Sequence, residues 1–106
     1  MNHEVSEPVR NLMEIDRLIH EPARLMLMVL LSAVAEADFL YLLHATGLTK
    51  GNLSTHLTKL EETNYITITK SFVGKTTRTV CQITEDGLTA LAAYREQMQA
   101  VIDGVV

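Results

Sequence analysis

The spacing of the hydrophobic residues changes from helical to strand-like after residue 62 of this 106-residue chain, and that change limits the fold more than any other feature. Between residues 49 and 62 the leucines recur every three or four positions, as on the buried face of an α-helix. From residue 66 the isoleucines alternate with threonines in "YITITKSF", which is typical of a β-strand. A second alternating run, "TTRTVCQIT", follows a Gly74-Lys75 turn signal and predicts a β-hairpin, which must pack on helices because an isolated hairpin is unstable.

The first half of the chain predicts three helices. Apolar residues keep helical spacing over residues 9–19, and "PARLMLMVLL" is apolar almost all round, so the helix beginning at Pro22 should be central to the core. Asp38 is suited to cap a helix over "FLYLLHA" after a short break around residues 35–37. Gly47 can end that helix, because glycine readily adopts the left-handed backbone conformation.

The second half predicts one helix on each side of the hairpin. Thr49 is a good N-cap for the helix with the leucine stripe, and Asn64 fits the left-handed position that closes it. Thr84 can cap a last helix over residues 85–103. The sequence therefore predicts a mainly α protein with a small β-hairpin (α+β), as a single domain over residues 1–106 with terminal helices 9–19 and 85–103.

Positive charge is concentrated in one third of a chain whose formal net charge is −4. Residues 49–80 carry two acidic side chains, against five basic ones: Lys50, Lys59, Lys70, Lys75 and Arg78. The segments on both sides have a net negative charge. Because the local distribution of charge sets the local potential, this third of the chain can attract a polyanion although the whole protein is acidic.

The basic third also contains the arrangement helix, short glycine-containing turn and second helix, which is the helix-turn-helix arrangement. Its second helix has a polar face opposite the leucines and is narrow enough for the major groove of DNA. On that face Gly51 permits close backbone approach, Asn52 can bind adenine, and Thr55 can contact a thymine methyl or a phosphate. The hairpin cations can contact the DNA backbone or minor groove. The predicted DNA-binding residues are Thr49, Lys50, Gly51, Asn52, Ser54, Thr55, His56, Lys59, Lys70, Lys75, Thr76 and Arg78.

Residues 18–95 resemble the winged helix-turn-helix transcriptional regulators of the MarR/ArsR type, most closely the small stand-alone winged-helix DNA-binding domain family. The resemblance lies in "TGLTKGNLSTHLTKLE", followed by "NYITITKSFVGK". It implies a winged-helix fold with extra terminal helices, a recognition helix at residues 49–62 and a wing at 70–79. It also implies a homodimer formed through the terminal helices. Asn64 replaces the family's usual glycine, and Asn tolerates the same backbone angle.

A domain of this size has too little core to cover every apolar stripe, so the stripes of the terminal helices are predicted to form the dimer surface. A two-fold dimer would place two recognition helices about one turn of DNA apart, so the operator should be an inverted repeat. The predicted interface residues are Val9, Leu12, Met13, Ile19, Met98, Val101, Ile102 and Val105.

Other functions have less support in the sequence than DNA binding. The histidines (His3, His20, His44, His56) match no metal-ligand spacing and the chain has one cysteine, Cys81, which is expected to be a small buried hydrophobe, so neither a metal nor another cofactor is predicted. No catalytic constellation is present, which argues against an enzyme. No apolar run is long enough to span a membrane and no signal peptide is recognised, so a cytoplasmic protein is expected. The alternative function is a protein–protein interaction module of the same fold without DNA binding. An unidentified small-molecule effector is compatible with the regulator.

Overall fold

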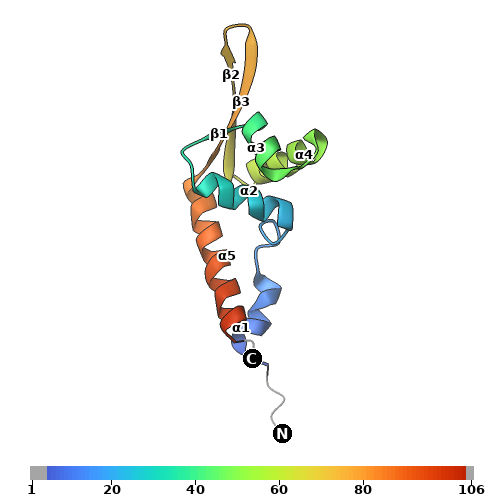
Figure 1. Cartoon of the computed structure of the whole chain (residues 1–106). Coiled ribbons are helices and arrows are strands. Elements are labelled where there is room, and N and C mark those ends of the chain that lie inside the picture. Colours follow the sequence, from blue (N-terminus) through green and yellow to red (C-terminus); the bar gives the residue numbers. More distant parts are fainter. Residues whose placement is uncertain (1–4, 105–106) are drawn as a thin grey trace.

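The computed structural model describes residues 5–104. The molecule is elongated, with principal-axis extents of 69 × 26 × 21 Å, and Figure 1 shows the hairpin at one end and the first helix beside the last turns of the C-terminal helix at the other. The predicted fold class is confirmed: the structure is mostly helical with one small antiparallel sheet. Its elements are α1 (Glu7–Arg10), the 3₁₀ helix η1 (Asn11–Glu14), α2 (Pro22–Ser32), β1 (Ala37–Asp38), α3 (Phe39–Thr46), α4 (Lys50–Glu62), β2 (Ile66–Val73), β3 (Thr76–Ile83) and α5 (Glu85–Asp103).

Helix α2 is the centre of the core, as its nearly uniform hydrophobicity predicts. Its Leu27, Met28 and Leu31 are completely buried. The predicted leucine stripe of α4 packs on this helix from one side, and the hairpin contributes Ile66 and Cys81. A fully buried leucine side chain contributes about 1.5–3 kcal/mol, so the stripe of Leu53, Leu57 and Leu60 alone holds α4 firmly on the body.

The predicted helix caps are all confirmed. The Asp38 carboxylate accepts a hydrogen bond from the Tyr41 amide at 2.8 Å, and the Thr49 hydroxyl accepts one from the Asn52 amide at 3.1 Å. The Thr84 hydroxyl caps α5 by accepting a hydrogen bond from the Gly87 amide at 2.9 Å. Gly47 ends α3 with φ of 70°, and Asn64 follows α4 with φ of 64°, so both adopt the left-handed conformation that the sequence predicted.

The sheet has the strand order β1-β3-β2 and is antiparallel throughout. At its inner end Ile66 lies opposite Ile83, so the isoleucines of the alternating pattern face the core. Strand β1 pairs only with Val80 and Cys81 of β3. The outer part of the hairpin, from the Lys70–Thr79 pair to the turn, is therefore two-stranded and projects beyond the body (Figure 1).

The prediction of one helix over residues 9–19 is wrong after Glu14, where the helical structure ends. Helix α1 ends at Arg10, η1 ends at Glu14, and Ile15 has an extended backbone with ψ of 147°. The Asp16 carboxylate explains the break, because its Oδ1 atom accepts hydrogen bonds from the backbone amides of Leu18 at 2.9 Å and Ile19 at 3.1 Å. Such a local bond satisfies the backbone without a helix. The turn directs Ile19 into the core, where it is completely buried.

Within residues 5–104, no helix has the length and hydrophobicity required to cross a membrane.

Candidate nucleic-acid interface

The outer face of α4 is open and polar, as predicted. Its exposed residues include the predicted contacts Lys50, Gly51, Asn52, Ser54, Thr55 and Lys59, together with Thr58 and, in the last turn, Glu61 and Glu62. Thr49, which precedes the helix, is exposed too, although its hydroxyl is engaged as the N-cap. None of these side chains is covered by another element of the described chain, so the whole face is available to a partner.

The hydrogen-bonding groups on this face differ in how free they are. Among residues 5–104, no hydrogen bond engages the side-chain amide of Asn52, so both its donor and its acceptor are open. The Thr55 hydroxyl donates to the Gly51 carbonyl oxygen at 2.9 Å, which leaves its oxygen lone pairs and its methyl group outward. Asn52 is therefore the residue of this face best suited to a bidentate contact with a base edge.

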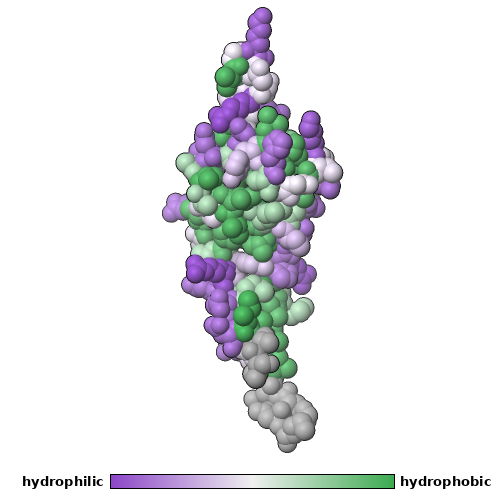
Figure 2. Space-filling view, viewed as in Figure 1, coloured by the Kyte–Doolittle hydropathy of each residue, from purple (hydrophilic) through white to green (hydrophobic). Residues whose placement is uncertain are grey.

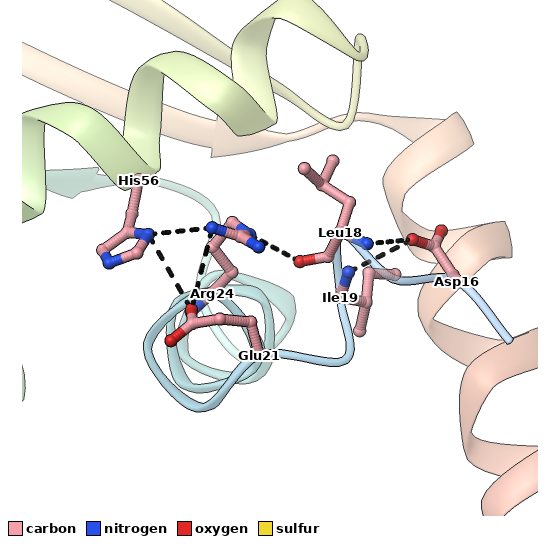
Figure 3. Close-up of polar contacts among 6 residues, drawn as sticks. All are labelled: Asp16, Leu18, Ile19, Glu21, Arg24 and His56. Carbon is pink, nitrogen blue, oxygen red and sulfur yellow. Dashed lines mark hydrogen bonds and ion pairs between the residues drawn. The ribbon is translucent and has the colours of Figure 1, made fainter.

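His56 does not lie on the open face of α4, where the sequence analysis placed it. Its side chain is half-buried and points at the N-terminus of α2 (Figure 3). The His56 Nδ1 atom lies 3.1 Å from Nη1 of Arg24 and 3.8 Å from Oε2 of Glu21. Burial acts to raise the pKa of Glu21, but hydrogen bonds from the Arg24 and Ala23 amides and the nearby His56 and Arg24 side chains outweigh it and lower the pKa. His56 thus contacts protein rather than open solvent.

The hairpin presents fewer unpaired cations than its sequence suggests. Lys70, Lys75 and Thr76 are exposed, and Lys75 lies in the turn beside Gly74. Arg78, in contrast, has its guanidinium 3.8 Å from the Glu36 carboxylate and 3.7 Å from the Asp38 carboxylate. These exposed pairs stabilise little, yet they offset the charge of Arg78 locally.

Lys70 is the hairpin cation nearest to α4. It lines one groove with Ser54 and Thr58 of α4. Since side chains alternate across a strand, Lys70 and Phe72 share the hairpin face that is turned toward α4. The groove brings the polar α4 surface and the inner part of the wing to one side of the molecule.

Two apolar residues near the hairpin turn were missed by the sequence analysis. Phe72 is 77% exposed and Val73 is 63% exposed, and Figure 2 shows hydrophobic colour just below the hydrophilic tip of the hairpin. Their position in the sequence could have indicated this exposure. Ile68 is the last residue of the strand that reaches the core, and Phe72 and Val73 lie four and five positions beyond it.

The predicted dimer residues within the described part of the chain divide into three groups. Val9, Met13 and Ile102 are exposed, whereas Leu12, Met98 and Val101 are partly buried. The prediction for Ile19 is wrong, because the Asp16 turn places that side chain inside the core. Val105 lies outside the described residues.

The structure adds an apolar groove between α2 and α5 that the sequence analysis missed. It has a volume of about 540 Å³, and its lining includes exposed Val29 and Leu88 together with Met98 and Ile102. The sequence of α2 could not predict this groove: the helix is apolar on nearly every side, so its pattern does not indicate which side is exposed.

The part of the chain that the structure describes contains no group of three or more potential metal ligands. Cys81 is completely buried, as expected for a small hydrophobe. Burial, together with the charge of Glu61, raises the pKa of its thiol to about 11. A thiol in this environment is a poor nucleophile and a poor metal ligand at neutral pH.

Comparisons with known proteins agree with this geometry. Residues 23–102 match the family described as winged helix DNA-binding domain. An uncharacterised protein of Methanocaldococcus jannaschii is 32% identical over 78 residues, which is 74% of this chain and 85% of that protein.

Solved structures show the same similarity. A transcriptional regulator homologue from Pyrococcus horikoshii superposes with a TM-score of 0.84 at 29% identity, covering 93% of this chain and 97% of that one. An ArsR family transcriptional regulator shares the fold, with a TM-score of 0.55 at 17% identity and coverage of 97% of this chain and 98% of the other. The chain belongs to the winged helix DNA-binding domain family.

Proposed function

We propose that this protein is a homodimeric transcriptional regulator that binds duplex DNA sequence-specifically, with α4 in the major groove and the hairpin as the wing. The observation that carries the proposal is the open face of α4. Asn52, Lys50 and Lys59 stand on a helix that is fixed to the body by three buried leucines. A rigid helix with free donors and acceptors is what base readout requires.

The dimensions of the helix support this placement. An α-helix with its side chains is about 10–12 Å across, which matches the roughly 12 Å width of the major groove. The exposed start of α4 also has free amide groups, which favour a phosphate oxygen. At Gly51 no described atom beyond its chain neighbours and the adjacent backbone of α4 lies within 4 Å of where a Cβ would be, which leaves room for the DNA backbone to approach.

The wing is the second contact in this proposal. Lys75 at the turn is placed to contact the phosphate backbone or the minor groove beside the site of α4, with Lys70 behind it on the side of the α4 groove. Arg78 contributes less than the sequence suggested, because Glu36 and Asp38 hold it. Phe72 adds an apolar surface that can lie against deoxyribose.

The proposed dimer uses the other end of the molecule. Val9, Met13 and Ile102 are exposed apolar residues of α1, η1 and α5, and Ile102 also lines the apolar groove between α2 and α5. A second copy covering this surface would remove it from water. Two-fold symmetry then places the two α4 helices about 34–36 Å apart, so the operator is an inverted repeat.

The experiment selects bound duplexes from a random pool and then measures affinity at several salt concentrations. Asn52→Ala should lower the preference for the selected sequence over random duplex by about tenfold, because a bidentate base contact discriminates by about 1–3 kcal/mol. Lys75→Ala should weaken binding to all sequences alike and reduce the salt slope by about one. Arg10→Ala removes the same charge from α1, at the far end of the molecule, and should leave both quantities unchanged. Salt-independent binding, or an unaltered preference in Asn52→Ala, would contradict the proposal.

The second candidate is a protein–protein interaction module without DNA binding. Two observations favour it: Arg78 is held by carboxylates, and Phe72 and Val73 are exposed on the hairpin. The same titration separates the two functions, because the module would not bind duplex DNA even at low salt.

A further inference from the structure

The irregular segment from Ile15 to Glu21, here called the junction, separates the two ends of the molecule. Before it lie α1 and η1, which pack on α5 at the end proposed for dimerisation. After it α2 begins, on which α4 is packed. Side chains of the junction form hydrogen bonds with α5 and with Tyr65, which lies between α4 and β2. Arg24 of α2 bonds to both the junction and α4.

Arg24 provides the contact with α4. Its side chain is only 11% exposed and extends from the first turn of α2 between the junction and α4 (Figure 3). Nε donates to the Leu18 carbonyl oxygen at 2.6 Å, and Nη1 donates to Nδ1 of His56 at 3.1 Å. The guanidinium has donors only, so it can join these two acceptors in a fixed planar geometry. Glu21, with Oε2 at 3.9 Å from Arg24 and 3.8 Å from His56, lies beside the pair.

Asp16 and His20 provide the other two contacts. The Tyr65 hydroxyl, just after α4, donates to Oδ2 of Asp16 at 2.5 Å, while Oδ1 of the same carboxylate holds the junction turn. His20 forms a hydrogen bond of 2.9 Å between its Nδ1 atom and the hydroxyl of Tyr94 on α5. One seven-residue segment is therefore bonded directly to Tyr65, shortly after α4, and to the helix of the proposed dimer surface, and it is connected to α4 itself through Arg24.

We propose that Arg24 and Asp16 are positioning residues that fix the orientation of α4 relative to α5. This inference rests on the proposed function. In a dimer held through α5, the angle between α5 and α4 sets the distance and the rotation between the two recognition helices. The junction therefore determines which spacing of half-sites the protein accepts, without touching DNA itself.

The geometry of DNA makes spacing a sensitive readout. Inserting one base pair between half-sites moves one of them by about 3.4 Å and rotates it by about one-tenth of a turn. A rigid dimer should therefore have one preferred spacing. A dimer whose α4 helices have lost a restraint should accept neighbouring spacings, although each half-site is still read by the same side chains.

The test uses a set of duplexes in which the selected half-site is repeated in inverted orientation, with the spacing changed one base pair at a time. Arg24→Met removes the guanidinium but retains most of the buried aliphatic chain. Arg17→Met, an exposed arginine of the same junction with no hydrogen bond or ion pair among residues 5–104, is the matched control. Tyr65→Phe removes only the hydroxyl that binds Asp16 and serves as a second variant in case Arg24→Met does not fold.

Wild type and Arg17→Met should bind most tightly at the same half-site spacing, and their affinity should fall steeply at neighbouring spacings. In Arg24→Met and in Tyr65→Phe the affinity ratio between the optimal and the neighbouring spacings should fall by at least about fivefold, with affinity for a single half-site unchanged within about twofold. A folded variant with the wild-type spacing ratio would overturn the inference, as would equal loss at every spacing and at the single half-site. If wild type itself shows no salt-dependent binding to duplex DNA, the proposed function fails instead.

Discussion

Two glycines near the starts of helices should respond in opposite directions to the same substitution. Gly51 lies in the first turn of α4 and Gly87 in the first turn of α5. Neither has a positive φ, so alanine is compatible with the backbone at both positions. Helix propensity alone predicts that Gly→Ala stabilises each helix by up to about 1 kcal/mol.

At Gly87 the surrounding atoms make the expected effect of alanine on stability unfavourable. A Cβ atom there would lie 2.2 Å from the Tyr65 carbonyl oxygen and 2.9 Å from Cγ1 of Ile83. The first contact is with backbone, which cannot rotate away, and that carbonyl also accepts a hydrogen bond from the Thr84 amide at 3.0 Å. Overpacking costs about 1–3 kcal/mol and a lost hydrogen bond about 0.5–1.5 kcal/mol, so after the helix gain Gly87→Ala should destabilise the fold by about 1–3 kcal/mol.

The assay is thermal and urea unfolding at one fixed protein concentration, because association changes the apparent stability. For a domain of this size the Gly87→Ala loss corresponds to a decrease in Tm of about 5–20 °C. Gly51→Ala should raise Tm by a few degrees, because no other described part of the protein lies within 4 Å of the added methyl apart from the adjacent α4 backbone and chain neighbours, but should weaken DNA binding. Shifts of Tm in the same direction for both variants, or unaltered stability of Gly87→Ala, would refute the reasoning.

Three further results are expected. Burial and the Asp16 hydrogen bond raise the pKa of Tyr65 to about 12, above its ordinary value of 10.0, so the folded state keeps this proton longer than the unfolded chain does. The free energy of unfolding should therefore fall as pH rises from 10 to 12, and comparison with Tyr65→Phe by urea unfolding should isolate that fall. Cys81, buried and with a raised pKa, should react with thiol reagents at neutral pH only as fast as the protein opens; immediate labelling of native protein would show that it is accessible. Thr49→Ala should cost about 1 kcal/mol in thermal unfolding and Thr49→Ser almost nothing, since serine keeps the capping oxygen; equal losses would show that the cap is not the cause.

Local signals in the sequence predicted most of the elements because local interactions form them. Capping side chains, left-handed residues and the change of hydrophobic period each act within a few positions, and α2, α3, α4, α5 and the hairpin all follow them. The open face of α4 was predictable for the same reason: it is the face opposite the leucine stripe. The helix phase also contained an overlooked signal. His56 lies three residues after Leu53 and four before Leu60, which places it at the edge of the buried stripe.

The remaining features depend on partners that are distant in the sequence. Residues 15–19 have helical spacing, yet Asp16 forms a turn through one carboxylate oxygen. The other carboxylate oxygen accepts a hydrogen bond from Tyr65, 49 positions away. Arg78 looked like a free cation because nothing in the hairpin opposes it. Its carboxylate partners come from β1 and the residue before it, which reach the hairpin only through strand pairing.

The two-stranded outer hairpin gives this fold an adjustable length. From Thr79 to the turn, no third strand among residues 5–104 pairs with β3, and the core ends at the residues that pair with β1. Each added residue pair would lengthen the hairpin by about 3.3 Å. One added pair would turn the side chains beyond the insertion to the opposite face of the hairpin, and two added pairs would return them to their original face. In the proposed complex, evolution or engineering could therefore change how far along the DNA the hairpin reaches, in steps of roughly 7 Å, at little cost to folding.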